Sequence, residues 1–180
     1  MLGLRIALGT LFIILVSALH IATVTIFPYP FNTVNITIIA LVFLLLTGRT
    51  KLSIIITIIM GVVVELYAVT PFGALLAALL ASLMVGIFMA SHIITTLSFL
   101  GGVALTFGMV VCYRLFFVML FSIYALRDET ITLSITQALG SIASETIATT
   151  FVGALFIGIY TIRNQRASAR IKTRRYDALR

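Results

Sequence analysis

The stretch that decides the fold is GVVVELYAVTPFG, which runs from Gly61 to Gly73. It places one acidic residue, Glu65, near the end of an unbroken apolar run, and a turn from Thr70 to Gly73 follows. Because Pro71 and Gly73 disfavour a continuing helix, the stretch predicts two antiparallel helices joined by a tight turn.

The composition indicates that most of the chain lies within a lipid bilayer. Of the 180 residues, 62% are apolar and only 9% are charged, and the mean hydropathy is +1.25. A soluble domain of this size needs a polar surface that these residues cannot supply. The single cysteine, Cys112, leaves neither a disulfide framework within the chain nor a cysteine cluster for a metal.

The positive charge is concentrated at the C-terminus. The net charge is +7, and seven of the twelve Lys and Arg residues follow Thr161. A basic segment directly after a membrane span is typical of a topology signal and of contact with anionic lipid headgroups. For this tail, residues 163–180, we therefore expect anionic lipids and no nucleic acid as the partner.

Apolar runs long enough to cross a bilayer predict six spans in one transmembrane domain, residues 1–162. The first run ends at Pro28 and Pro30, and the second is short. The expected fold is all-α, a compact polytopic bundle with six transmembrane helices. Its spans are 6–27, 34–47, 52–69, 72–90, 97–120 and 142–162.

The stretch from Thr130 to Ile162 is too long for one span, and its first half is rich in Thr, Ser and Gln. We expect an interfacial helix over 130–139, a break near Gly140 and then the sixth span. A single long tilted helix is the alternative.

Loop charges predict the orientation. Arg5, Arg49 with Lys51, and the C-terminal basic cluster fall on one side of a six-span arrangement, whereas the opposite side receives nearly neutral links. The positive-inside rule then places both termini in the cytoplasm. Five spans would separate these basic segments.

Small residues recur every four positions in the fourth span. They are Ala74, Ala78, Ser82, Gly86 and Ala90. Because small residues let helix backbones approach closely in lipid, this ridge predicts a helix-packing face. The third span is its nearest candidate partner within the chain, and a partner protein is the alternative.

Three ionisable residues interrupt the spans: Glu65, Arg114 and Glu145. Charges at membrane depth are costly, so they face the protein interior and pair. Residue counts from the span ends put all three at a similar height in the outer leaflet, and we expect Arg114 to bridge the two carboxylates. This cluster either holds helices together or forms a ligand or partner site. A third option is that each residue snorkels separately to the membrane surface. Candidate hydrogen-bond partners are Tyr67, Thr70, Tyr113 and Ser144.

No catalytic or metal-binding pattern is recognisable in the sequence. His20 and His92 are far apart and lack neighbouring Cys or Asp, and there is no serine triad, HExxH or phosphate-binding glycine loop. We therefore expect no cofactor, no metal and no enzymatic activity. Asn35-Ile36-Thr37 matches the N-glycosylation pattern, which is common by chance.

The opening stretch resembles the rod shape-determining protein MreD family, whose pattern is G-x-x-x-D-L-x-x-x-[ST]-x-x-G. The family's usual Asp is replaced here by Glu, which keeps the charge on a longer side chain. The hydropathy plan is also similar, since a helix rich in small residues follows the motif and a basic tail ends the chain. The motif residues are Gly61, Glu65, Leu66, Thr70, Pro71 and Gly73.

The resemblance implies a non-catalytic subunit of the cell-elongation machinery in the bacterial inner membrane. Such proteins act with the bitopic protein MreC, near actin-like MreB filaments and the peptidoglycan synthases. In hydropathy the family is also similar to the substrate-binding components of energy-coupling factor vitamin transporters, and such a component is the alternative function. Those components share an Ala-xxx-Ala face on the first helix, for which this chain offers only Ala18 with Ala22, near the wrong end.

Overall fold

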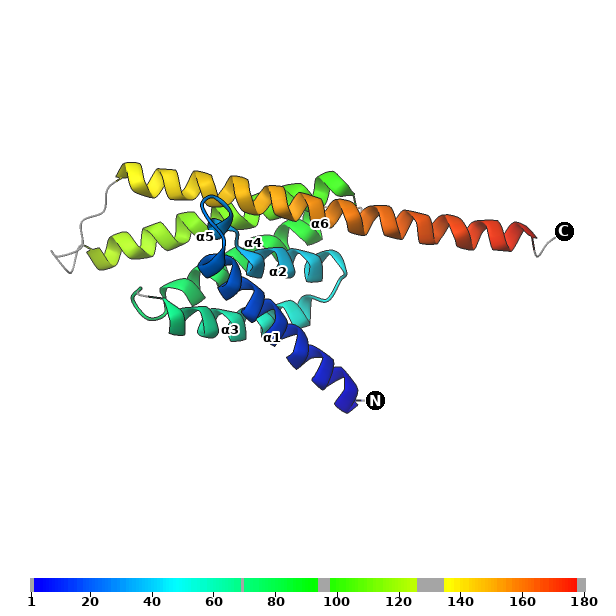
Figure 1. The fold of residues 1–180 in the computed structure, drawn as a ribbon, viewed down its shortest axis with the longest axis horizontal. Helices are drawn as coiled ribbons and strands as arrows, with labels where there is room; N and C mark the ends of the chain where they lie inside the picture. The colour runs from blue at the N-terminus through cyan, green and yellow to red at the C-terminus, as the bar shows by residue number, and fades with distance from the viewer. Residues whose placement is uncertain (1, 69, 94–97, 126–134, 178–180) are drawn as a thin grey trace.

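The computed structural model describes residues 2–68, 70–93, 98–125 and 135–177, and every regular element in these ranges is helical. The expectation of an all-α fold is therefore confirmed. In chain order (Figure 1) the elements are α1 (Leu2–Ile26), the 3-10 turn η1 (Phe31–Thr33), α2 (Ile36–Leu46), α3 (Thr50–Tyr67), α4 (Ala74–His92), α5 (Phe99–Ala125) and α6 (Ile135–Asp177).

Five of these helices are long and apolar enough to cross a membrane, which makes the chain a multi-pass membrane protein. The exception is α2, an apolar helix of 11 residues. At 1.5 Å per residue it rises about 16 Å, roughly half the thickness of a hydrocarbon core. The helix in the predicted second span, 34–47, is therefore too short to cross the hydrocarbon core on its own.

The ends of the helices have local causes in the sequence. Helix α1 stops just before Pro28. Helix α2 ends in a Schellman motif, in which Gly48 adopts φ +72° and the Arg49 N–H donates to the Leu44 carbonyl at 2.9 Å. Helix α4 begins directly after Gly73, whose φ of +93° turns the chain back from α3.

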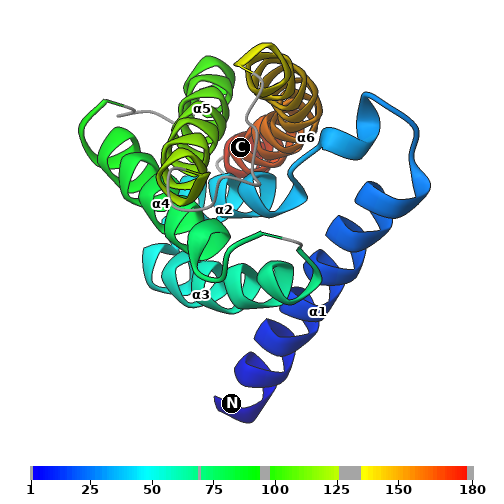
Figure 2. The ribbon, with the colours of Figure 1, turned by 90° about the vertical axis from the view of Figure 1, so that its left-hand side faces the viewer.

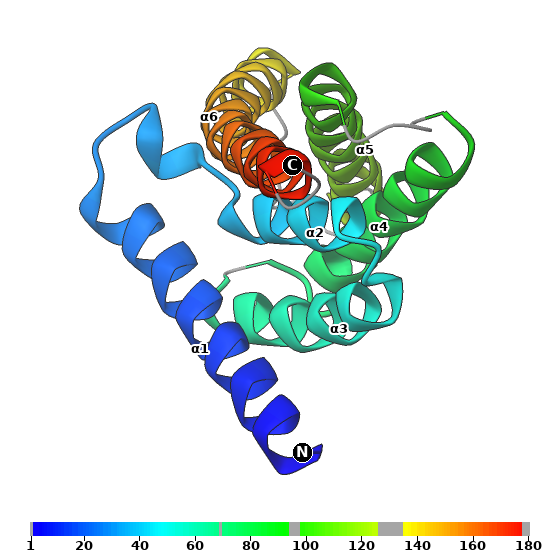
Figure 3. The ribbon, with the colours of Figure 1, turned by 90° about the vertical axis from the view of Figure 1, so that its right-hand side faces the viewer.

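The short helix α2 occupies the centre of the bundle. It contacts each of the other helices, and its Ile38, Leu41 and Val42 side chains are almost completely buried. Figures 2 and 3, which view the molecule from two opposite sides, show α2 surrounded by the other helices and α1 leaning away from them towards its N-terminus. Between residues 9 and 26 of α1 only Val16 and Thr23 are buried.

Helix α6 corrects the prediction of a break near Gly140. The helix continues through this residue from Ile135 to Asp177, while residues 130–134 of the predicted interfacial helix lie outside the described residues. A glycine inside a helix costs only about 1 kcal/mol, and Gly140 does not adopt the positive φ that would turn the chain. The long-helix alternative therefore holds from Ile135 onwards.

The C-terminal part of α6 carries residues 163–177 of the predicted basic tail beyond the rest of the bundle as a helix (Figure 1). Its 43 residues rise about 65 Å, which is more than twice the thickness of a hydrocarbon core. Both chain termini lie towards the same end of the molecule (Figure 1).

Candidate functional site

Several buried polar side chains surround Asn35, the residue directly before α2. This residue caps α2, because its Oδ1 accepts a hydrogen bond from the Ile38 N–H at 3.3 Å. Its own backbone N–H donates to Thr149 Oγ1 of α6 at 2.9 Å. Two donors at the start of α2 are thereby satisfied by side chains, which matters in a membrane protein because lipid offers no hydrogen bonds.

Glu145 lies one helical turn before Thr149, so both side chains project from the same face of α6 towards α2. Glu145 Oε1 accepts a hydrogen bond from Asn35 Nδ2 at 3.2 Å, and Glu145 is almost completely buried. A carboxylate beside the N-terminus of α2 also interacts favourably with the positive end of that helix.

Arg114 of α5 completes the site through an ion pair between its Nη2 and Glu145 Oε2. The exposed fractions of the two side chains are 23% and 3%, so Glu145 is the more deeply desolvated partner. The guanidinium also lies 5.9 Å from the ring centroids of Tyr113 and Phe117. Neutralising both charges in one pair reduces the cost of placing them within the bundle.

We define the buried polar cluster as Asn35, Arg114, Glu145 and Thr149. Three different helices supply its members, α2 through its cap, α5 and α6. The cluster therefore ties together segments that lie up to 114 residues apart in the sequence.

Glu65 does not join the ion pair, so the expectation that Arg114 bridges two carboxylates is wrong. Among the described residues, the only ion pair of Arg114 is with Glu145. Glu65 instead accepts a hydrogen bond from the Leu75 N–H of α4 at 3.2 Å. Equal height along a bundle does not determine which groups face one another.

The Glu65 contact stabilises the hairpin between α3 and α4. Glu65 is 5% exposed, and its second oxygen, Oε2, is buried without a hydrogen-bond partner. Its contact with Leu75 satisfies one of the free N–H groups in the first turn of α4. On the same face of α3, one turn earlier, Gly61 lies so close to α4 that a Cβ there would be 3.2 Å from Leu76 Cα and would overlap Leu76 Cδ1.

The other predicted hydrogen-bond partners lie elsewhere. Tyr67 is exposed, and the Ser144 hydroxyl donates to the Ser141 carbonyl within α6. Thr70 Oγ1 is buried without a hydrogen-bond partner. Of the four, Tyr113 alone touches the cluster, through its ring.

The ridge of small residues on α4 is mostly buried, and two of its members contact helices other than α3. Ser82 donates to the Met109 carbonyl of α5 at 2.8 Å. A Cβ on Gly86 would lie 2.6 Å from Met109 Sδ and 2.9 Å from Leu45 Cδ1 of α2. Ala74 and Ala78 are also buried, and Ala90 is half-buried. Ser82 and Gly86 thus pack against α5 and α2, whereas the α3 side of α4 carries Leu76.

Sequence reasoning missed Asn35 and Thr149. Asn35 stands directly before an apolar helix, which is the typical position of an N-cap, and this signal could have identified it. Its near-complete burial and its use as a cap also argue against the glycosylation pattern that it begins. Thr149 has no such local signal.

The cluster contains a charge pair and amide and hydroxyl groups. Within the described ranges there is no group of three or more His, Cys, Asp or Glu residues that could hold a metal ion. This arrangement can join helices and neutralise buried charge.

Comparisons with protein-family models, with curated proteins and with solved structures give no match to this chain.

Proposed function

We propose that the chain is a non-catalytic subunit of the bacterial cell-elongation machinery that scaffolds an MreC-like bitopic partner in the inner membrane. In this proposal the six helical segments alternate in direction and both termini are cytoplasmic. The common end at which the two termini lie (Figure 1) agrees with an even number of segments. The basic tail would then meet the anionic lipids of the cytoplasmic leaflet.

The hairpin between α3 and α4 is the observation that carries the proposal. Three motif residues act together there: Gly61 permits the close approach of α4, Glu65 accepts from its first turn, and Gly73 turns the chain with a positive φ. The spacing shared with the MreD pattern therefore corresponds to one structural unit. This supports the resemblance, because an accidental match would not need to give its residues roles in one hairpin.

Leu66 is a motif residue whose role this hairpin does not explain. Its side chain is 73% exposed, and the neighbouring Tyr67 and Phe72 are exposed as well. A leucine that contributes little to the interior of its own protein is available to a neighbour in the membrane. We therefore assign Leu66 and Phe72 to the contact with the bitopic partner.

A pull-down of the tagged full chain from membranes of its source bacterium tests the proposal. We expect an MreC-like single-span protein in the eluate, and a reduced amount with Leu66→Ala. Ile55→Ala is the matched control, because Ile55 is an exposed aliphatic residue on α3 that lies three turns from Leu66. Equal recovery of the bitopic protein with both variants would contradict the assignment of Leu66.

The alternative function, a substrate-binding transporter component, is favoured by two buried atoms without hydrogen-bond partners, Arg114 Nε and Glu65 Oε2. A polar ligand could satisfy both. The same pull-down separates the two functions. Recovery of transporter ATPases and their coupling protein, in place of a bitopic protein, would overturn the scaffold proposal.

A further inference from the structure

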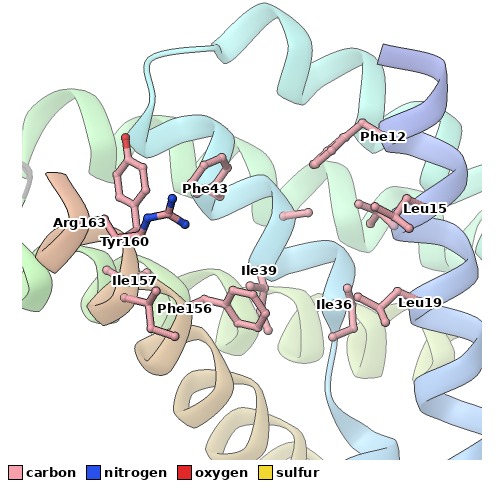
Figure 4. Close-up of a pocket in the computed structure, with 13 residues that line it drawn as sticks. Phe12, Leu15, Leu19, Ile36, Ile39, Phe43, Phe156, Ile157, Tyr160 and Arg163 are labelled. Atoms are coloured by element: carbon pink, nitrogen blue, oxygen red, sulfur yellow. The ribbon is translucent and has the colours of Figure 1, made fainter. Parts of the chain in front are cut away.

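An apolar groove of about 460 Å³ lies between α1 and α6, and residues of α2 form its base. Figure 4 shows Leu15 and Leu19 of α1 on one wall and Phe156 of α6 on the other. The only residues with a charged or polar end group among those lining it are Tyr160 and Arg163, both on α6 beside Phe43 of α2. The groove is therefore apolar along its length and polar at one end.

The polar end lies where α6 leaves the membrane-spanning segment. The apolar part of this helix runs from Leu139 to Arg163, and the chain beyond it carries six more basic residues. The Tyr160 ring packs edge-on against Phe43, with centroids 5.1 Å apart, which fixes the tyrosine at this boundary. Tyrosine and arginine at the end of a span are typical of the headgroup region.

Arg163 is available to a ligand. Its side chain is exposed, and the part of the chain that the structure describes offers it no ion-pair partner. Anionic headgroups are the counter-charge that a membrane presents at this height, and guanidinium binds phosphate through paired hydrogen bonds.

The size of the groove favours an acyl chain over a helix. A transmembrane helix is about 10–12 Å wide with its side chains and about 30 Å long. A volume of about 460 Å³ admits only a fraction of such a helix. An acyl chain is narrow and flexible and can follow the space between α1 and α6.

We propose that this groove binds an anionic phospholipid, with its phosphate at Arg163 and Tyr160 and one acyl chain against α2. Bound in this way, the lipid would fill the opening that the outward lean of α1 creates. The proposal requires a membrane protein but does not depend on the elongation function.

The absence of tryptophan from the chain allows a direct test. Phe156→Trp places one fluorophore in the groove, and Phe107→Trp is the matched control. Phe107 is exposed on α5 and lies outside the groove. It follows the start of α5 at Phe99 by eight residues, and Phe156 precedes the end of the apolar part of α6 at Arg163 by seven. The full chain is reconstituted in phosphatidylcholine vesicles that contain a small fraction of brominated phosphatidylglycerol, whose bromines quench tryptophan.

We expect the apparent affinity of the lipid for the Phe156→Trp site to exceed that for the control about fivefold, the factor contributed by one basic side chain near an anionic surface. Arg163→Gln should remove this excess, and Arg163→Lys should retain part of it. Equal quenching of the two tryptophans would overturn the proposal. So would equal quenching by brominated phosphatidylcholine, or a groove tryptophan that no lipid quenches because a protein helix covers it.

Discussion

Replacing Arg114 with leucine tests the energetic role of the buried polar cluster. The substitution leaves Glu145, with a side chain only 3% exposed, without its counter-charge. Removal of one partner of a buried ion pair typically costs 3–5 kcal/mol. We expect the lower end, about 3 kcal/mol, because Asn35 still donates to the carboxylate. The ratio of folded to unfolded protein would fall about a hundredfold.

A second substitution separates charge from packing. In the double variant Arg114→Leu with Glu145→Gln, the glutamine still accepts from Asn35 but carries no charge. We expect most of the lost stability to return, to within about 1 kcal/mol of the wild type, because no uncompensated charge remains.

Unfolding by sodium dodecyl sulphate in mixed micelles, followed by circular dichroism, measures all variants on one scale. Arg49→Leu is the control, because Arg49 is an exposed arginine in the link between α2 and α3, and its replacement should change stability by less than about 0.5 kcal/mol. A double variant no more stable than Arg114→Leu alone would refute the reasoning. The loss would then come from the contacts of the guanidinium with Tyr113 and Phe117.

Four further substitutions, at three positions, give expected shifts in the same unfolding measurement. Gly61→Ala should destabilise by about 1–3 kcal/mol, because the new methyl group meets Leu76; an unchanged midpoint would contradict the close packing of α3 on α4. Asn35→Asp should destabilise more than Asn35→Ser, although both can cap α2, because only aspartate faces Glu145 with a like charge; the reverse order would exclude that contact. Gly140→Ala should stabilise by about 1 kcal/mol, since the residue is helical with open space around it, and a loss would indicate a break there.

The helix boundaries could be predicted to within a few residues where the signal is local. Pro28 ends the first apolar run, and Pro71 with Gly73 separates the third from the fourth. These residues end helices through their own backbone preferences, which follow from the residue type alone. The predicted break at Gly140 is wrong because a lone glycine lowers helix stability without imposing a turn.

The pairing of polar groups could not be predicted to the same degree. Residue counting along a helix estimates the height of Glu65, Arg114 and Glu145, but the direction in which each side chain points depends on how the helices rotate and pack. Helix rotation also decides which helix the small residues of α4 contact. The sequence predicts the neighbouring α3 as their partner. Ser82 of α4 contacts α5, a helix that follows α4 in the chain.

The two acidic residues within the membrane-spanning helices have one feature in common that their spacing alone did not reveal. Glu65 accepts from the first turn of α4, and Glu145 accepts from the residue that caps α2. Each carboxylate therefore lies at the N-terminal end of another helix, where free N–H groups and the helix dipole favour negative charge. The requirement is strongest for α2, because a helix of only 11 residues cannot place both of its ends in water across a bilayer. On this reasoning Arg114 offsets the charge of a carboxylate whose first role is to hold the start of α2 inside the bundle.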